Sequence, residues 1–385
     1  MTMRRPEALS TLRRAAELYG DVVTAYVDVS RASETGAREV ELRADNVRRE
    51  LLESGAAEDL VETVVARLTE PTGHGGDASR VVVAHDGTLV TDLVLAGAVA
   101  GHQHHGPVAH LLELARAMSD DVRYALVRVD HTGADITLAS TIGAVERELT
   151  SEGDHDVLHK VKGGGWSHRR FQMRVQDSQD QNADTVARDL DSLLTKERVD
   201  LVLLTGEPSA VSRVSESAGQ QVSERLQVLE HGGRAEGADD EQLDEEVAAA
   251  VQRCRSLRID EVLDRLGPAD APKAIGVGET LEALRRGEVE TLILQDGALD
   301  DRRAYAGPDP MLLATDPEEL RSLGVEEPAA ERLDELLLRA AIAQDADLLP
   351  LHAPIGALPD GVGAVLRFSS RPDPRPSTRD DGEDL

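Results

Sequence analysis

Residues 160–174 read KVKGGGWSHRRFQMR, a stretch in which five cationic side chains surround three consecutive glycines. The cations are Lys160, Lys162, Arg169, Arg170 and Arg174. The chain as a whole is strongly acidic, since its 385 residues carry a formal net charge of −31. One basic segment in an acidic protein predicts an anionic partner that binds to this segment alone, which we call the finger.

The glycines at 163–165 allow backbone conformations that are closed to other residues, and they let a partner approach closely. Behind them, residues 167–194 predict one long helix, with Ser167 as its N-cap and Val186 and Leu190 on its buried stripe. A glycine-rich turn before a helix start favours phosphate, because free N–H groups and the helix dipole point at the ligand. From the residues alone, a solvated surface loop without a ligand fits equally well.

Strand signals flank the long helix on both sides. Residues 124–130 and 134–139 are strand-like runs joined by the turn 131–133, and a third run at 199–205 ends in Gly206-Glu207-Pro208. The finger is therefore expected to lie within an α/β domain.

The finger resembles a loop of a known family. Gly164, Gly165, Ser167, Arg170 and Phe171 match the Gly-Gly-Gln-Ser-x-x-Arg-Phe loop of the archaeal and eukaryotic peptide chain release factor and Pelota family. The resemblance implies a ribonuclease-H-like middle domain. It points to the bacterial and archaeal branch of the family, which includes dormancy-associated mycobacterial proteins and the ribosome hibernation factor Balon. Residues 276–284, 289–294 and 361–368 resemble the third domain of the family, so the resemblance covers roughly residues 120–370.

One departure from the family loop bears on the chemistry. Trp166 stands where the hydrolytic members have the glutamine that helps to place a water against the ester of peptidyl-tRNA. Indole has one N–H donor and no acceptor, so it does not replace an amide. Gln172 lies too far along the predicted helix to be taken as a substitute. Trp166 offers a flat face for stacking on a nucleobase, worth roughly 1–3 kcal/mol, with burial in an apolar core as the alternative.

Length predicts more than one domain, because 385 residues exceed what one hydrophobic core serves. We expect three α/β domains, the middle one ribonuclease-H-like with a glycine-rich finger loop and the third a small α/β sandwich. The predicted ranges are 1–106 for the N-terminal domain, 107–270 for the release-factor-like middle domain, 271–369 for the C-terminal domain and 370–385 for a disordered tail.

The first domain alternates strand and helix signals. Its predicted elements are strands at 22–29, 81–84, 89–90 and 93–95, helices at 37–52 and 57–68, and a turn at His85-Asp86-Gly87. In the second half of the chain, helices are predicted at 243–266, before a break at 267–272, and at 329–342, the latter strongly amphipathic. Cys254 lies in the first of these helices, where a small buried hydrophobe is favoured over a reactive thiol.

Four histidines lie close together beside glycine and proline, namely His102, His104, His105 and His110. Metal binding by such a tract is one interpretation. The irregular spacing and the lack of nearby cysteines make a weak zinc signal. We therefore expect an interdomain linker without metal, followed by a helix at 108–118.

Composition excludes several classes of protein. The single cysteine rules out an intramolecular disulfide framework, and no apolar run reaches the roughly 20 residues of a membrane-spanning helix. The N-terminus lacks the apolar segment of a signal peptide. We expect a cytoplasmic protein, monomeric by the family resemblance, that binds no membrane and needs no cofactor.

The leading hypothesis is a non-catalytic factor that occupies the A site of the ribosome, with the finger reaching the peptidyl transferase centre. The resemblance suggests hibernation under stress, with elongation factor Tu as a further partner. The residues predicted to contact rRNA or tRNA are Lys160, Lys162, Gly163, Gly164, Gly165, Trp166, Ser167, His168, Arg169, Arg170 and Arg174. Two alternatives stay open: a peptidyl-tRNA hydrolase that acts in ribosome rescue, and a stress protein that binds no ribosome.

Overall fold

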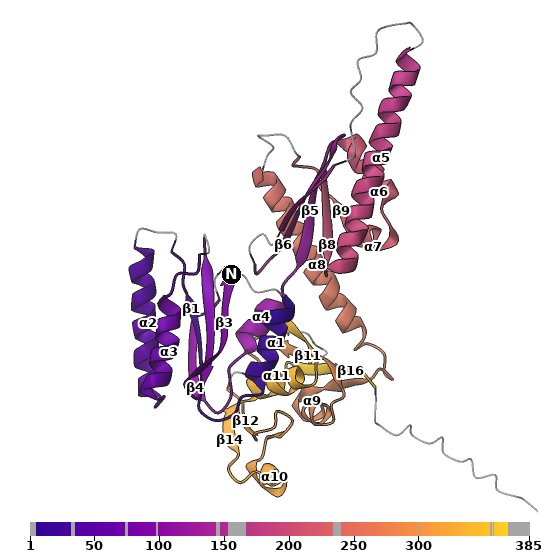
Figure 1. Cartoon of the computed structure of the whole chain (residues 1–385). Helices are drawn as coiled ribbons and strands as arrows, with labels where there is room; N and C mark the ends of the chain where they lie inside the picture. The colour runs from indigo at the N-terminus through magenta and orange to yellow at the C-terminus, as the bar shows by residue number, and fades with distance from the viewer. Residues whose placement is uncertain are drawn as a thin grey trace, which may run out of the picture. The chain divides into compact units, whose positions relative to one another are not determined.

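A computed structural model describes residues 5–31, 35–73, 76–97, 99–143, 147–152, 167–233, 240–299, 301–354, 356 and 358–368 (Figure 1). The chain forms two compact units, Met1–Glu261 and Val262–Leu385. The predicted tail at 370–385 lies outside the described residues.

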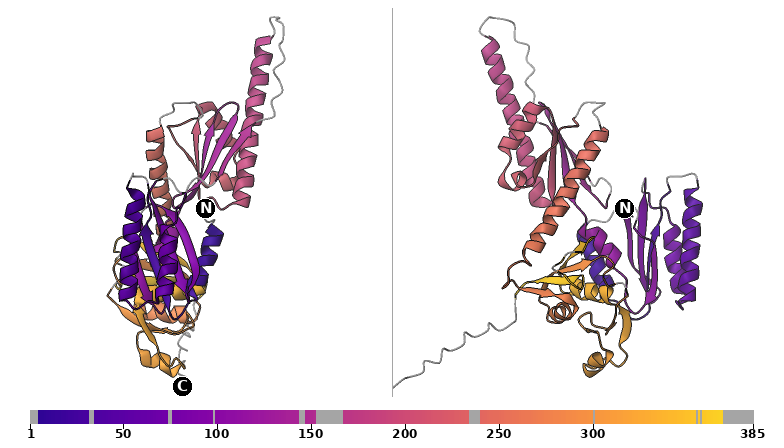
Figure 2. Two further views of the ribbon diagram at one scale, coloured as in Figure 1. Left: turned by 60° about the vertical axis from the view of Figure 1, so that its left-hand side comes forward. Right: turned by 180° about the vertical axis from the view of Figure 1, so that it is seen from behind.

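The first part of unit one is an antiparallel sheet in the order β3-β2-β1-β4. Its strands are β1 Val22–Asp28, β2 Ala78–His85, β3 Thr88–Ala96 and β4 His102–Gly106. Its helices are α1 Arg5–Ala16, α2 Gly36–Glu53 and α3 Glu58–Thr69. Helices α2 and α3 cover one face of the sheet (Figure 2), where Val40, Leu51 and Val64 pack against Val23 and Val82. The strand predicted at 22–29 and the helices predicted at 37–52 and 57–68 are thereby confirmed. Strand β2 is longer than the predicted 81–84, and the two short strands predicted at 89–90 and 93–95 form one continuous strand, β3.

The turn between β2 and β3 has the geometry that its sequence predicts. Asp86 and Gly87 both have positive φ angles, 47° and 70°. A two-residue hairpin loop with both central residues in this region is a type I′ turn, which Asp-Gly favours because glycine meets no steric penalty there.

The predicted linker at the histidine cluster is wrong. His102 to Gly106 form strand β4, which pairs with β1 so that His102 lies opposite Tyr26 and His104 opposite Thr24. The helix predicted at 108–118 begins only at Leu112. The reason is that His110 is held by β1: its main-chain N–H donates to Thr24 Oγ1 (3.2 Å) and its carbonyl accepts from the Tyr26 hydroxyl (3.0 Å).

The second part of unit one is a five-stranded sheet in the order β7-β6-β5-β8-β9. The strands are β5 Arg123–Val129, β6 Gly133–Ser140, β7 Arg147–Glu152, β8 Leu201–Gly206 and β9 Leu226–Val228. Strand β6 is antiparallel to both of its neighbours, whereas β8 is parallel to β5 and to β9. This order and direction are the ribonuclease-H-like arrangement that the resemblance implies.

Helix α4 Leu112–Ser119 precedes this second sheet in the chain. Both faces of the sheet are covered by helices that follow, namely α5 Ser167–Lys196, α6 Pro208–Ser217, α7 Gln220–Ser223 and α8 Asp240–Asp264. Residues of α5 and α6 pack on one face, around Val127, Val202 and Leu204. Residues of α8 pack on the other face, around Leu126 and Leu203.

Unit two contains two small sheets. The first has the order β10-β16-β11-β15 and the second β13-β12-β14. Its elements are β10 Lys273–Ile275, α9 Gly276–Arg285, β11 Val289–Gln295, β12 Arg303–Ala306, β13 Leu313–Ala314, α10 Pro317–Ser322, β14 Ala329–Arg332, α11 Leu333–Ala343, β15 Asp347–Leu351 and β16 Val362–Leu366. This unit confirms the α/β class predicted for the end of the chain.

One helix of unit two differs from its prediction. The segment predicted as an amphipathic helix at 329–342 is strand β14 followed by α11. Every residue of α11 from Leu333 to Ile342 is buried, so the helix has no solvent face there. The polar residues of this helix suggested a solvent-exposed face, but they are buried with hydrogen-bond partners inside the protein. The Arg339 guanidinium, for example, donates to the carbonyl oxygens of Gly307 (3.0 Å) and Pro308 (2.7 Å).

Candidate nucleic-acid interface

The finger, residues 160–174, follows strand β7 in the chain and continues into the first turns of helix α5. Residues 153–166 lie outside the described part of the chain, and with them the predicted contacts Lys160, Lys162, Gly163, Gly164, Gly165 and Trp166. The backbone of Ser167, His168, Arg169, Arg170 and Arg174 forms the first turns of α5, as predicted, while their side chains are not among those described. The structure therefore describes the backbone of the finger from Ser167 onward, whereas residues 160–166 lie outside the described part of the chain.

Helix α5 extends well beyond the sheet on which it packs (Figure 1). It has 30 residues, which corresponds to about 45 Å at 1.5 Å per residue. Its described core residues, Ala183, Val186, Leu190 and Leu193, all belong to the second half and pack on the sheet. Ser167 precedes Ala183 by about 24 Å along the helix axis. The finger is thus attached to a helix that projects from the domain.

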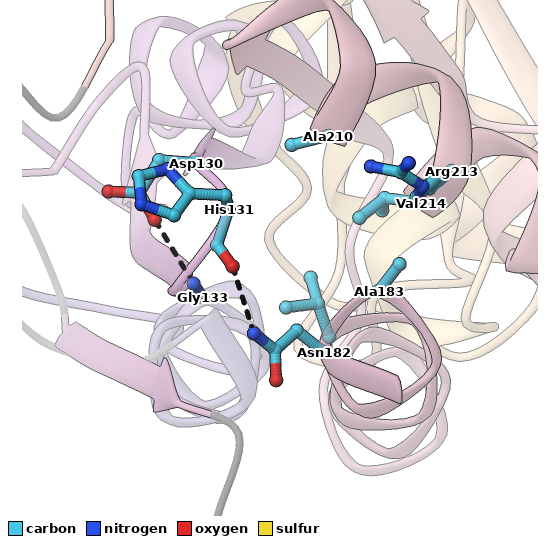
Figure 3. Close-up of a pocket in the computed structure, with 9 residues that line it drawn as sticks. Asp130, His131, Gly133, Asn182, Ala183, Ala210, Arg213 and Val214 are labelled. Atoms are coloured by element: carbon cyan, nitrogen blue, oxygen red, sulfur yellow. Dashed lines mark hydrogen bonds between the residues drawn. The ribbon is translucent and has the colours of Figure 1, made fainter. Parts of the chain in front are cut away.

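The projecting helix is anchored where it reaches the sheet. The Asn182 side-chain amide donates a 2.9 Å hydrogen bond to the main-chain carbonyl of His131, in the turn between β5 and β6 (Figure 3). Arg213 of α6 forms an ion pair with Asp180 (Nε–Oδ1 2.8 Å). Ala183 of α5 and Val214 of α6 line one small pocket, which Asn182, His131 and Arg213 also line (Figure 3). Helix α5 is therefore held between the β5–β6 turn and α6.

The turn itself is braced by a carboxylate. Asp130 Oδ1 accepts hydrogen bonds from the main-chain N–H groups of Thr132 (2.7 Å) and Gly133 (3.1 Å). His131 Nδ1 lies 3.3 Å from Glu207 Oε2, at the start of α6. The carbonyl that Asn182 binds is thus held in a fixed turn.

Strand β7, which precedes the finger in the chain, is anchored to the same helix. Ser151, in the last described strand before the finger, is buried and its hydroxyl donates to Asp189 Oδ2 of α5 at 2.6 Å. Strand β7, which precedes the finger in the chain, and helix α5, into which the finger continues, are consequently attached to each other.

Charge is distributed unevenly along α5 and the finger. The sequence has no acidic residue between Asp156 and Asp177, and the first turn of α5 contains none. Acidic residues follow in the anchored half, at Asp180, Asp184, Asp189 and Asp191. A helix N-terminus carries a positive partial charge that favours anions. Arginines at this end therefore add to a positive potential that already attracts phosphate. They also reduce the stability of the helix, because like charges at its N-terminus repel each other.

The resolved pKa shifts of this domain lie on the α8 face and have structural causes. Burial raises the pKa of the Tyr124 phenol, and the nearby Asp244 carboxylate adds to the effect. Burial also raises the pKa of the Cys254 thiol, which packs against the α8 core cluster and is half-buried, as predicted. The hydrogen bond from His231 lowers the pKa of Glu246. These residues contribute to packing and helix attachment.

Two features of this region were absent from the sequence interpretation. Strand β7 was not predicted, since its alternating polar residues resemble a loop. Asn182 was not singled out, although it lies four residues before Val186 and eight before Leu190, on the same stripe. A polar residue in an apolar stripe signals a buried hydrogen-bond partner.

Residues 123–271 match the model of the bacterial archaeo-eukaryotic release factor family 2. This part of the chain is therefore similar to that family. We call residues 123–271 the release-factor-like domain, which contains the whole five-stranded sheet, the finger and α8.

Two mycobacterial relatives match along most of the chain. They are the uncharacterized proteins Rv2629 and MT2704 of two Mycobacterium tuberculosis strains, each 27% identical over 365 residues, which is 93% of this chain and 96% of the relative. Among solved structures, Saccharomyces cerevisiae Dom34 is 14% identical, with 76% of this chain and 79% of Dom34 covered, at a TM-score of 0.36. Archaeoglobus fulgidus Pelota is 13% identical, with 94% of this chain and 92% of Pelota covered, at a TM-score of 0.32.

No described helix has the length and apolar character needed to cross a membrane.

Proposed function

We propose that this protein is a non-catalytic ribosome-binding factor that occupies the A site and extends its finger to the peptidyl transferase centre. The observation that supports this function best is the position of the finger in the chain. A run of 20 residues, 157–176, has five cations and no acid, and from Ser167 onward it forms the first turns of a projecting helix in the release-factor-like domain. The rest of the chain is strongly negative, so contact with RNA is confined to this end.

The finger has the residue types that such a contact needs. Lysine and arginine neutralise phosphates and release condensed counterions. Three glycines keep the loop thin enough to pass between RNA strands. Trp166 supplies a stacking face for a base exposed in the peptidyl transferase centre. Ser167 and the helix start add main-chain donors for phosphate.

The target that we propose is the idle ribosome of a stressed cell, because the finger resembles the branch of the family that includes hibernation factors. Such a factor would act in the cytoplasm as a monomer, with elongation factor Tu as a further partner. Blocking the A site needs binding but no bond cleavage, which agrees with Trp166 at the position of the family's glutamine.

The test is co-sedimentation of the purified full chain with vacant 70S ribosomes at several salt concentrations. The finger variant changes Lys160, Lys162, Arg169 and Arg170 to alanine. A matched variant removes four exposed arginines outside the finger, Arg38, Arg188, Arg253 and Arg321, and so makes the same change in net charge. We expect the finger variant to lose binding and the matched variant to keep it. Equal binding by wild type and the finger variant would remove the finger from the interface.

Hydrolysis of peptidyl-tRNA is the alternative that the same material can test. If wild type releases peptide from stalled ribosomal complexes and Gly165→Ala abolishes the release, the non-catalytic assignment is wrong. If only Trp166→Gln releases peptide, the family's chemistry was lost at this position.

A further inference from the structure

A groove lies along the edge of the five-stranded sheet, between strand β7 and the second half of helix α5. Its floor is apolar, because Ile136 of β6 and Leu193 of α5 are buried and Leu149 of β7 packs against the same core. The volume of the groove is about 240 Å³, which is below the roughly 300–1,000 Å³ of pockets for drug-sized ligands. The groove therefore suits side chains of a peptide better than a whole small molecule.

Strand β7 forms the outer edge of the sheet. In the part of the chain that the structure describes, it pairs with β6 alone, along residues 147–152. An edge strand presents main-chain N–H and C=O groups on its unpaired side, and another extended chain can pair with them. Side chains alternate along a strand, so Arg147, Leu149 and Ser151 share the face toward α5. An added strand would likewise direct every second side chain into the groove.

The groove has two cations without ion-pair partners among the described residues, Arg147 at the start of β7 and Lys196 at the end of α5. Both side chains are exposed. The acids of the groove already have partners: Asp189 accepts the hydrogen bond from β7 given above, and Glu197 Oε2 lies 3.1 Å from Arg123 Nη2. The groove thus combines an apolar floor with two positive charges that are free to meet an anionic group, in a chain whose net charge is −31.

We propose that this groove binds an extended acidic peptide of a partner protein, which adds to β7 as a further strand. An apolar side chain of the peptide enters the groove over Leu149, and an acidic side chain two residues away pairs with Arg147 or Lys196. In this binding mode the main-chain hydrogen bonds supply affinity and the alternate side chains supply specificity. The site is separate from the finger, and the proposal does not depend on ribosome binding.

The lining of the groove favours a peptide over a nucleic acid. Single-stranded RNA is bound by cations together with aromatic side chains on which its bases stack. None of the described residues that line the groove is aromatic. The apolar floor has no use for a phosphate, whereas it can bury an aliphatic side chain.

The probe is a fluorescein-labelled peptide with the sequence Thr-Glu-Thr-Leu-Thr-Glu-Thr. Its leucine lies two residues from an acid in both directions, so it presents the same pattern whether it adds parallel or antiparallel to β7, and threonine favours the extended conformation. Further peptides change one feature each: lysine replaces glutamate, serine replaces leucine, or every second main-chain N–H is methylated, in each of the two possible phases.

Fluorescence polarisation measures binding of these peptides to the full-length protein. The groove variant is the double charge reversal Arg147→Glu, Lys196→Glu. The matched variant reverses two exposed arginines elsewhere in the release-factor-like domain, Arg188→Glu and Arg253→Glu, and so makes the same change in net charge. All of these side chains are exposed, and circular dichroism and urea unfolding verify that both variants fold like wild type.

We expect saturable binding of the acidic peptide by wild type and by the matched variant. The groove variant should bind it at least about tenfold more weakly, because two attractive contacts become repulsive, and should bind the lysine peptide better than wild type does. Replacing leucine by serine should weaken binding to wild type, and methylation in one phase but not in the other should abolish it.

The proposal is overturned if wild type shows no saturation up to about 1 mM protein, or if the matched variant loses as much affinity as the groove variant. It is also overturned if neither methylated peptide binds more weakly, since strand addition needs main-chain donors. Binding of a short oligouridylate that the groove variant loses and the matched variant keeps would assign the two cations to RNA phosphates instead, and would overturn the proposal as well.

Discussion

The side-chain amide of Asn182 donates a 2.9 Å hydrogen bond to the carbonyl of His131, and this contact joins α5 to the β5–β6 turn where the helix leaves the sheet. Asn182 is 4% exposed, so its amide has replaced water with a protein partner. The half of α5 that precedes it projects toward the finger. A contact at the base of a projecting helix controls where its far end points.

Asn182→Ala is expected to destabilise the release-factor-like domain by about 1 kcal/mol, because it removes one net hydrogen bond from a buried position. It should also speed hydrogen exchange in α5 near residue 182. Urea unfolding and hydrogen exchange measure the two effects. The control is Gln181→Ala, the exposed neighbour in the same helix. Equal stability of the two variants would mean that the His131 contact does not anchor α5.

Elements that depend on nearby residues could be predicted from the sequence, whereas elements that depend on distant residues could not. The Asp86-Gly87 turn, the apolar strand β8 and the stripe of α5 were predicted correctly, because each depends on neighbours a few residues away. Strand β4 was missed because its partner β1 lies about 80 residues earlier, and half-buried histidines beside glycine look like a loop. Only the pairing shows that they form an edge strand.

In the candidate interface, too, the local feature was predictable and the long-range contacts were not. The helix that carries the finger begins at Ser167, as predicted from the glycines and the serine. The anchors, Asn182 with His131 and Ser151 with Asp189, were not predicted, because each joins segments that are 51 and 38 residues apart. Sequence periodicity indicates which residues face a core but not which polar groups meet there.

A buried ion pair in the first sheet leads to a prediction about acid stability. The Arg80 guanidinium donates to both carboxylate oxygens of Asp92 (Nε–Oδ1 2.6 Å, Nη2–Oδ2 2.9 Å), and Arg67 of α3 binds the same carboxylate. Burial raises the pKa of Asp92, but the hydrogen bonds from both arginines outweigh it and lower the pKa below its ordinary value of 3.8. The Arg80 side chain is only 4% exposed.

Asp92→Asn should cost about 3 kcal/mol at neutral pH, because it leaves the buried Arg80 charge without its partner. A folded-state pKa below the unfolded value contributes stability above the unfolded pKa, and this contribution is lost as pH falls through the folded pKa. The difference between wild type and variant should therefore be constant above about pH 5 and shrink below pH 3.8. Urea unfolding across this range measures it. Asp86→Asn, whose side chain is 78% exposed, is the control and should change stability by less than about 0.5 kcal/mol.

The raised pKa of Cys254 predicts that its thiol reacts slowly with alkylating agents. Because the thiolate is the reactive form, burial that raises the pKa should make alkylation by iodoacetamide at pH 7.5 at least about tenfold slower in the native protein than in urea. The double variant Cys254→Ser, Ser256→Cys moves the thiol to an exposed position of the same helix. It should react at nearly the unfolded rate. Fast alkylation of native wild type would contradict the packing of Cys254 against the α8 core.

Stacking by Trp166 predicts a loss of affinity that is independent of salt. Removing one base–aromatic stack costs roughly 1–3 kcal/mol, so Trp166→Ala should weaken binding to vacant 70S ribosomes about 5- to 150-fold. Trp166→Phe keeps an aromatic face and should keep most of the affinity. If the alanine and phenylalanine variants lose equal affinity, Trp166 contributes by some means other than stacking.

The basic finger predicts the salt dependence of ribosome binding. Each neutralised phosphate contributes about −0.7 to −0.9 to the slope of log affinity against log salt concentration. Five cations that all contact phosphate therefore predict a slope of about −4, and the variant that lacks four of them predicts about −1. The matched variant at Arg38, Arg188, Arg253 and Arg321 adds the same negative charge to the protein, so it experiences the same general repulsion from rRNA, yet its slope should stay near that of wild type. Co-sedimentation from low to moderate salt gives all three slopes. A wild-type slope near zero, or a matched variant as flat as the finger variant, would show that these cations do not meet phosphate on the ribosome.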